Sequence, residues 1–138
     1  MNLLEALETG YNLLKSNKIT SYRIDTEVLL SDSLNISKER LILNLDQTIT
    51  YQSYNNFLSK IKRRKANEPI AYILKKREFW KNEFYINKNV LIPRPETEHL
   101  VEEALRIISK NQKKKLLEIG IGSGCLITSV LKDRKNCT

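Results

Sequence analysis

The residues with the clearest chemical potential form a glycine-rich loop, Gly120-Ile121-Gly122-Ser123-Gly124, which closely follows the acidic Glu118. Glycines at alternate positions let the backbone turn sharply and approach a ligand closely, and the N–H groups of a following helix would point at that ligand. The GxGxG spacing differs from the dinucleotide fingerprint GxGxxG. It suits S-adenosylmethionine, which presents a carboxylate and an amine but no pyrophosphate. Glu118 could order the loop and balance the ligand's ammonium group; a tight turn without a ligand is the alternative.

A second group of charged residues lies in the segment Ile92-Pro93-Arg94-Pro95-Glu96-Thr97-Glu98. The two prolines hold Arg94 in an extended pose, with three polar side chains directly behind it. The pattern predicts a pre-organised charged lip near the glycine loop. On these residues alone, a rigid linker before a capped helix is the stronger interpretation.

Other reactive residue types carry weaker signals. His99 is the only histidine, and its acidic neighbours favour a solvated surface position. Cys125 is expected to pack against the loop, and Ser123 has no histidine placed beside it, so no catalytic nucleophile is predicted. Cys125 and Cys137 match neither a disulfide framework nor a zinc spacing, so no metal site and a reducing cytosol are expected.

The elements that must position these side chains begin with a helical bundle over residues 1–67. Apolar residues at helical spacing fill 2–15, and Ser21, Ser37 and Thr50 are candidate N-caps of three further helices. The fourth helix ends in a basic run, residues 60–65, before Pro69 disfavours helix. Such a run is usually a solvated helix end, with contact to a ribosomal or release-factor surface as the alternative.

The pattern changes after this bundle. β-Branched and aromatic residues over 70–92 predict an extended linker with a hairpin, and Asn82 and residues 87–89 are the turn candidates. Aromatic residues beside basic ones in this linker could stack on a partner, although a core role is favoured. A helix follows the prolines, Leu116–Ile119 predicts a buried strand, and Cys125 begins another helix. The expected fold class is therefore α+β, with boundaries at 1–67, 68–95 and 96–138.

Charge and composition narrow the range of functions. The net charge is +8, and residues 69–138 hold 14 of the basic and 8 of the acidic residues. A basic balance suits a nucleic-acid partner, but Lys, Asn and Ile together supply 44 of 138 residues, a bias expected of an AT-rich genome. No apolar run of membrane-spanning length occurs, and Glu5 and Glu8 interrupt any signal peptide. A cytoplasmic protein without a membrane partner is expected.

Taken together, these segments resemble one family. The order EPIAY, REFW, VLIPRPETE and LLEIGIGSGC is similar to that of the release-factor glutamine N5-methyltransferases, the HemK/PrmC family, and residues 23–30 resemble their N-terminal helical domain. The resemblance runs across nearly the whole chain. The PRPETE segment followed by a methyltransferase glycine loop is specific, although neither piece is specific alone.

The resemblance implies a fold and a reaction. A helical domain would dock the release factor, a hairpin would link it to a Rossmann-like class I methyltransferase domain, and S-adenosylmethionine would methylate the glutamine amide of the Gly-Gly-Gln tip of a class 1 release factor. The partner would be that release factor, with ribosome association a further expectation and DNA not expected. The residues that would bind the cofactor by resemblance are Gly120, Ile121, Gly122, Ser123, Gly124, Glu118, Arg94, Glu96, Thr97 and Glu98.

The chain also departs from the family pattern. Lys75 and Lys81 stand where the family usually has glycines, which would alter the turns of the hairpin. The Asn-Pro-Pro-Tyr motif that grips the target amide does not occur, and neither does the acidic residue expected on the second strand. No catalytic residue is therefore assigned, and the expectation is a truncated enzyme with little activity. A non-catalytic release-factor or ribosome binding module and half of a nucleic-acid methyltransferase are the alternatives.

Overall fold

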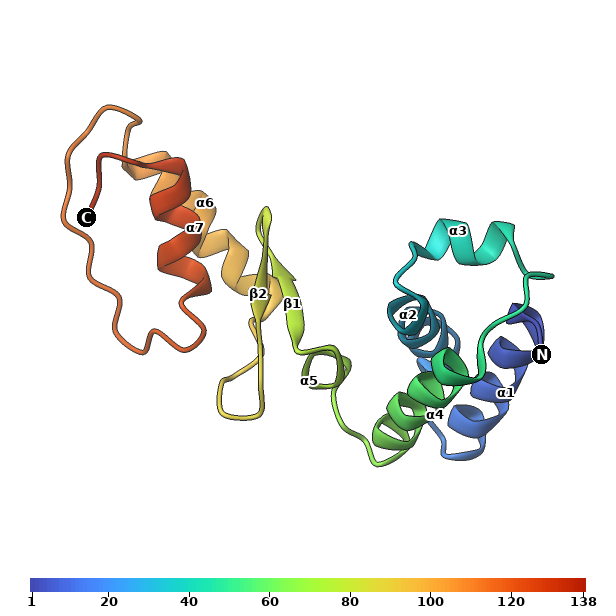
Figure 1. Cartoon of the computed structure of the whole chain (residues 1–138). Helices are drawn as coiled ribbons and strands as arrows, with labels where there is room; N and C mark the ends of the chain where they lie inside the picture. Colours follow the sequence, from blue (N-terminus) through green and yellow to red (C-terminus); the bar gives the residue numbers. More distant parts are fainter. The chain divides into compact units, whose positions relative to one another are not determined.

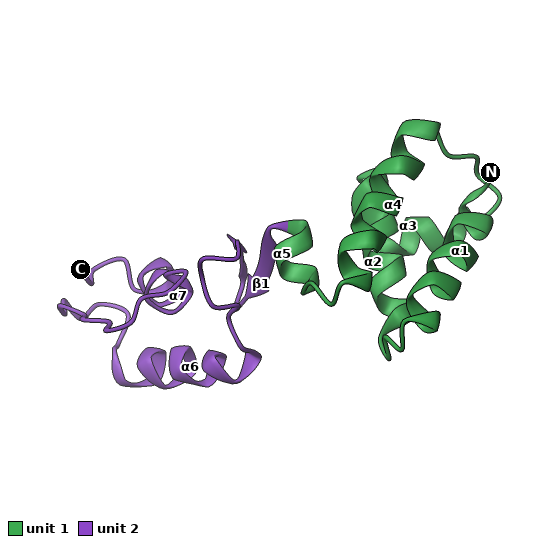
Figure 2. Cartoon of the chain, turned by 90° about the horizontal axis from the view of Figure 1, so that it is seen from below, with its two compact units in different colours: residues 1–74 green, residues 75–138 purple.

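A computed structural model describes residues 1–138 as two compact units, unit 1 from Met1 to Leu74 and unit 2 from Lys75 to Thr138 (Figures 1 and 2). The division falls at residue 74, whereas the sequence pattern predicts boundaries at 67 and 95. Each unit has its own apolar core. None of the helices is long and apolar enough to cross a bilayer.

Unit 1 is the predicted helical bundle. Its helices are α1 (Leu3–Ser16), α2 (Tyr22–Leu34), α3 (Lys38–Leu43), α4 (Tyr51–Lys65) and α5 (Ile70–Leu74). The Ser37 and Thr50 side chains accept the backbone N–H groups of Arg40 and Ser53, as capping predicts. Ser21 precedes α2 but does not cap it, because its hydroxyl donates to the Asp25 carboxylate instead.

The core of unit 1 lies where α1, α2 and α4 meet. Its fully buried residues come from all three helices and from α3, and include Leu3, Leu14, Leu29, Leu30, Leu41, Phe57 and Ile61. Gly10 lets α1 approach its neighbours closely: a Cβ built on it would lie 2.5 Å from Thr26 Cγ2 and 2.8 Å from Phe57 Cζ. The helix spacing in this bundle therefore depends on one residue without a side chain.

The basic run at the end of α4 is largely engaged in ion pairs within unit 1. Lys60 Nζ lies 2.6 Å from the Asp32 carboxylate, and Arg64 Nε lies 2.7 Å from that of Asp25. Both pairs are mostly shielded from solvent and join α4 to α2. The run therefore acts in packing, and the expectation of a solvated helix end is wrong for most of it.

The segment after Pro69 is helical, so the expectation of extended structure there is wrong for residues 70–74. Pro69 starts a short helix, α5, because its carbonyl accepts the N–H groups of Tyr72 and Ile73. The Arg63 guanidinium binds the Glu68 carboxylate with both arms and donates to the carbonyls of Tyr72 and Ile73. Arginine thus satisfies the free carbonyl groups at the end of α5.

Unit 2 begins with the predicted hairpin, formed by β1 (Lys76–Phe79) and β2 (Asn82–Tyr85). The antiparallel strands pair Phe79 with Asn82, so the turn is Trp80-Lys81 and the prediction of a turn at Asn82 is wrong. Lys75 and Trp80 adopt left-handed backbone conformations with φ of 59° and 55°. Glycine is favoured at such φ values, and Lys75 is one of the positions where the family resemblance expects it.

The second half of unit 2 contains the 3₁₀ turn η1 (Pro95–Thr97) and two packed helices, α6 (Glu98–Ile107) and α7 (Cys125–Asp133), which lie side by side in Figure 1. Trp80 ties the hairpin turn to both helices. Its backbone N–H donates to Glu98 Oε1 at 2.9 Å, and its indole Nε1 donates to Asp133 Oδ2 at 3.2 Å.

The expected buried strand over Leu116–Ile119 does not form. The sheet contains only β1 and β2, and the side chains of Leu117 and Ile119 are 87% and 89% exposed. The main chain runs extended beside the C-terminal residues, where Leu116 N donates to the carbonyl of Thr138. Thr138 N donates in return to the carbonyl of Lys114, but this single residue is the segment's only main-chain partner. The prediction fails because one residue does not make a strand with which the segment could form a ladder.

Candidate functional site

The glycine loop has the backbone conformation that its sequence predicts. Gly120, Gly122 and Gly124 have φ values of 79°, 54° and 71°, in the left-handed region that other residues rarely adopt. Gly124 N donates to the carbonyl of Ile121 at 2.7 Å, which closes a turn inside the loop. The loop then leads directly into α7, whose N-cap is Gly124. Three left-handed residues in five give this loop a shape that only glycine adopts without strain.

A cavity of about 210 Å³ lies between the loop and the proline-containing segment. Its lining residues come from these two stretches of unit 2: Leu91, Ile92, Pro93, Arg94, Thr97, Glu118, Gly120, Ile121, Gly122, Ser123, Cys125 and Leu126. The structure therefore brings together the two motifs that the sequence analysis singled out. Arg94 supplies a positive charge at this cavity and Glu118 a negative one.

The N-terminus of α7 presents hydrogen-bond donors on the cavity side. The backbone N–H groups of Cys125 and Leu126 make no hydrogen bond within the chain, as expected in the first turn of a helix. The third donor of this turn, Ile127 N, is taken by Glu118 Oε2 at 3.0 Å. Two free donors and a helix dipole therefore favour an anionic group, such as a carboxylate, in this cavity.

Two roles were predicted for Glu118: ordering the loop and balancing a ligand's ammonium group. The hydrogen bond to Ile127 N fits the first of them. The Glu118 carboxylate bridges the extended segment before the loop to the first turn of the helix after it. The second role, balancing a ligand's ammonium group, stays a prediction.

Three of the predicted site residues lie outside the lining of this cavity. Gly124 is the N-cap of α7 and shapes the loop from behind. Glu96 is exposed in η1, and the Glu98 carboxylate accepts the Trp80 backbone N–H in place of facing the loop. Arg94 and Thr97 do line the cavity, and Thr97 N donates to the Arg94 carbonyl at 3.0 Å, which holds the two residues in one turn.

Sequence reasoning missed the apolar half of the lining. Leu91, Ile92 and Leu126 line the cavity, and Leu91 is 74% exposed. The sequence did contain a signal for Ile92. This residue directly precedes Pro93-Arg94-Pro95, so the fixed backbone of that stretch also fixes the position of its side chain. His99 is exposed and lies 3.3 Å from Glu102, one turn along α6, away from the lining of the cavity. Its predicted surface position is confirmed.

The two units together define a class of protein: a small helical domain followed by a unit that presents a glycine loop at a helix N-terminus. A family model described as the PrmC N-terminal domain matches residues 5–74, which is nearly all of unit 1. The chain belongs to this family.

Curated relatives match across nearly the whole chain. A protein of Leptospira interrogans named release factor glutamine methyltransferase is 37% identical over 136 residues, covering 98% of this chain and 48% of the relative. Proteins of the same name from Clostridium acetobutylicum and Koribacter versatilis are 38% and 33% identical over 136 and 133 residues, covering 99% and 96% of this chain and 48% of each relative. The chain therefore spans about half the length of the curated relatives it matches.

Proposed function

We propose that unit 1 docks a class 1 release factor, and that unit 2 holds the amino-acid end of S-adenosylmethionine at the glycine loop. The reaction served would be methylation of the glutamine side-chain amide in the release factor's Gly-Gly-Gln tip. The observation that carries this proposal is the match of unit 1 to the PrmC N-terminal domain, joined in one chain to the loop cavity. The names of the relatives support the same reaction.

The loop supports the cofactor half of the proposal by its donor set. The free N–H groups of Cys125 and Leu126 suit the cofactor's carboxylate, and the carboxylate of Glu118 suits its ammonium group. The apolar side chains of Ile92 and Leu126 would exclude water from the rest of that end. When bound, S-adenosylmethionine supplies an electrophilic methyl group on its sulfonium sulfur.

We also propose that residues 113–133 correspond to the first strand, loop and helix of a Rossmann-like methyltransferase domain. The loop conformation and the helix after it fit this assignment, although the strand is unpaired in the structure. The Asn-Pro-Pro-Tyr motif, which by resemblance grips the target amide, does not occur in these 138 residues. We therefore expect these residues by themselves to transfer no methyl group.

The docking half is tested by calorimetric titration of the chain with a purified class 1 release factor. Binding is expected, and a release factor with its tip glutamine changed to alanine should bind equally well, because unit 1 rather than an amide pocket would hold it. Absence of binding to either release factor would contradict the proposal.

The cofactor half is tested by following backbone amide resonances during titration with methionine, adenosine and S-adenosylmethionine. Methionine should shift the amides of Gly122, Cys125 and Leu126, because it carries the carboxylate and the ammonium group, whereas adenosine should not. Micromolar affinity for S-adenosylmethionine would show instead that the site is complete, and equal shifts with adenosine would contradict the assignment of the loop.

A non-catalytic binding module is the second candidate, because the matched family model coincides with unit 1 alone. In that case the release factor binds while methionine leaves every loop amide unshifted at millimolar concentration. The two titrations together therefore separate the candidates.

A further inference from the structure

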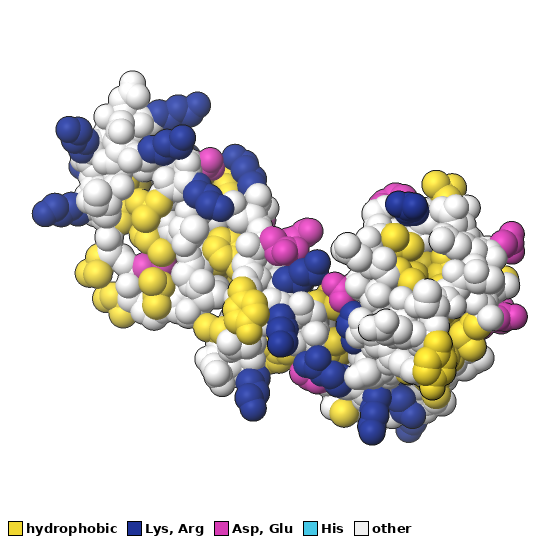
Figure 3. Space-filling view, in the orientation of Figure 1, with side chains coloured by type: hydrophobic (Ala, Val, Ile, Leu, Met, Phe, Trp, Pro, Cys, Tyr) yellow, Lys and Arg dark blue, Asp and Glu magenta, His cyan; other side chains and the backbone are white.

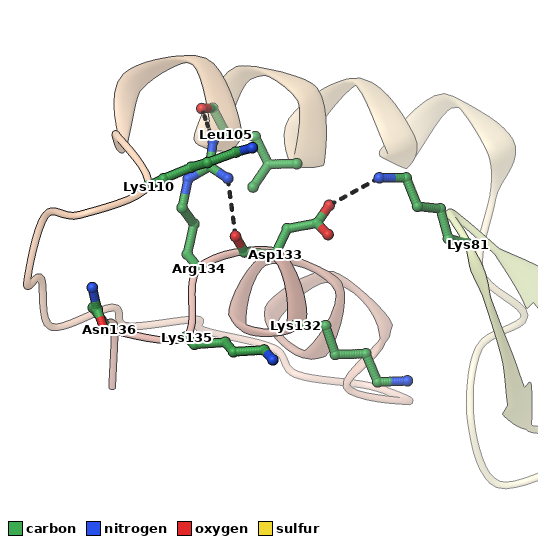
Figure 4. Close-up of a pocket in the computed structure, with 8 residues that line it drawn as sticks. All are labelled: Lys81, Leu105, Lys110, Lys132, Asp133, Arg134, Lys135 and Asn136. Carbon is green, nitrogen blue, oxygen red and sulfur yellow. Dashed lines mark hydrogen bonds and ion pairs between the residues drawn. The ribbon is translucent and has the colours of Figure 1, made fainter.

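A second depression in unit 2, separate from the glycine-loop cavity, is surrounded by cationic side chains. It has a volume of about 540 Å³ and lies at the C-terminal ends of α6 and α7 (Figure 4). The residues around it are Lys81, Leu105, Lys110, Lys132, Asp133, Arg134, Lys135 and Asn136. Five cations therefore surround one carboxylate.

A buried arginine, held by hydrogen bonds to main-chain carbonyl groups, forms part of the wall of the depression. Arg134 is 9% exposed, and its guanidinium donates to the carbonyls of Leu105, Ile108 and Asp133. It thereby satisfies carbonyl groups at the end of α6 and fixes that end to the end of α7. Because one N–H on each of its three nitrogens is held in this way, Arg134 contributes a fixed positive charge more than a flexible contact.

The lysines around the rim differ in how they are engaged. Lys81 Nζ lies 3.2 Å from Asp133, and Lys132 Nζ lies 2.6 Å from the Asn82 side-chain oxygen. Lys110 and Lys135 are exposed and make no ion pair or side-chain hydrogen bond within the chain. Two lysines are therefore free to contact an anion, in a field that the remaining cations make positive.

The positive field extends beyond the depression. The segment that follows α6 carries Lys113, Lys114 and Lys115, all exposed and without a side-chain partner. Figure 3 shows Lys and Arg side chains gathering on this part of unit 2, with few acidic groups among them. A ligand with one negative charge would use only a fraction of this surface, whereas a chain of regularly spaced charges could use all of it.

We infer that this depression binds a chain of phosphate groups, and that its ligand is the phosphodiester backbone of single-stranded RNA. Lysine is a compact cation that binds phosphate as a point charge, without the paired geometry that carboxylate recognition by arginine uses. The half-buried indole of Trp80 stands next to Lys81, whose ammonium lies 5.4 Å from the ring centre. Trp80 does not line the depression, but its indole donates to Asp133, which does, so a base of an RNA strand that crosses the rim could stack on the indole.

The experiment measures binding of a fluorescein-labelled twelve-nucleotide uridine RNA to the full chain by anisotropy, across a series of salt concentrations. With about four phosphates contacted, the slope of log affinity against log salt should be roughly −3 for a single strand. The test variant is Lys110→Gln with Lys135→Gln. It should reduce the slope to roughly −1.5 and lower the affinity at low salt by about tenfold.

The matched control is Lys62→Gln with Lys88→Gln. Both lysines are exposed, neither has a side-chain partner, and neither lines the depression, so the net charge of the chain falls by the same amount. This control should keep the slope of the unaltered chain and its affinity within about twofold. Circular dichroism spectra of both double variants should match that of the unaltered chain, because all four side chains project into solvent.

Three results would overturn the inference. If both double variants weaken binding equally, net charge alone attracts the RNA. If a twelve-residue glutamate peptide competes as well as unlabelled RNA, the site does not select phosphate. If inorganic tripolyphosphate binds at low salt while the RNA does not, a small free phosphate chain is the ligand and the assignment to RNA fails.

Discussion

Replacing Gly10 with alanine should destabilise unit 1, although the same change stabilises most helices. The new Cβ would lie 2.5 Å from Thr26 Cγ2 and 2.8 Å from Phe57 Cζ. Both contacts are shorter than real Cβ atoms tolerate, and both neighbours are fully buried, so neither can move into solvent. The Thr26 hydroxyl also donates to the Tyr22 carbonyl at 2.7 Å, which restrains its rotation. Helix α1 must therefore shift away from α2 and α4.

Two opposing effects set the size of the change. Alanine in a helix interior is favoured over glycine by up to about 1 kcal/mol. Overpacking a well-packed core usually costs about 1–3 kcal/mol, and two contacts below 3.0 Å place this site in the upper part of that range. The free energy of unfolding should consequently fall by about 1–2 kcal/mol. With a urea m-value of about 2 kcal/mol/M, the middle of the usual range for small proteins, the midpoint should fall by roughly 0.5–1 M.

Urea unfolding followed by far-ultraviolet circular dichroism measures this change, since most helical residues belong to unit 1. The matched variant combines Gly10→Ala with Thr26→Ser, which removes the closest atom, Cγ2, and keeps the hydroxyl. It should recover part of the lost stability relative to Thr26→Ser alone, because the contact with Phe57 remains. The packing argument is refuted if the Gly10→Ala variant is as stable as the unaltered chain. It is also refuted if Gly10→Ala costs as much stability in the Thr26→Ser background as it does in the unaltered chain.

Four further outcomes follow from the two units. Lys75→Gly should stabilise the chain by about 0.5–1 kcal/mol in urea unfolding, because φ at Lys75 is 59°; a loss of stability would show that the lysine is not strained. A hydrogen bond from the Trp80 indole holds the pKa of the Asp133 carboxyl below its usual 3.8, and a second hydrogen bond, from Lys81, lowers this pKa further. This interaction stabilises the folded state above pH 3.8 and is lost as the pH falls through the lower folded-state pKa, so Trp80 fluorescence should titrate there, and Asp133→Asn should abolish that titration. Burial, followed by the charge of a neighbouring glutamate, raises the pKa of Tyr11 to about 12, so absorbance titration should show one late tyrosine that Tyr11→Phe removes. Amide hydrogen exchange should be faster over 113–119 than in α7, since only Leu116 N in that segment donates to the main chain; the reverse order would contradict the unpaired state.

The features predicted correctly are those that a few neighbouring residues determine. Ser37 and Thr50 mark the starts of α3 and α4 because a cap needs only its own helix turn. The β-branched and aromatic residues over 70–92 predicted a hairpin, which forms at residues 76–85, but its turn was misplaced. Asn82 has turn chemistry, yet it lies in β2, because pairing with Phe79 and the anchoring of Trp80 fix the register.

The features that sequence reasoning missed depend on partners distant in the chain. Nothing near Asp25 indicates that its carboxylate will meet Arg64, 39 residues later. The indole–carboxylate contact of Trp80 and Asp133 spans 53 residues. A basic run or an isolated acidic residue therefore appears solvated in the sequence, since charge pairing across helices leaves no local pattern.

The glycine loop and the segment before it show the difference between structure that neighbouring residues determine and structure that depends on a distant partner. Leu116–Ile119 has the composition of a buried strand, but a strand also requires a neighbouring strand with which to pair, and the structure offers only the single residue Thr138. The loop nevertheless keeps its left-handed glycines, its internal turn and the bond from Glu118 to α7. Its conformation therefore does not depend on a formed sheet. The cavity therefore presents the free N–H groups of Cys125 and Leu126 to the proposed carboxylate ligand although residues 116–119 belong to no sheet.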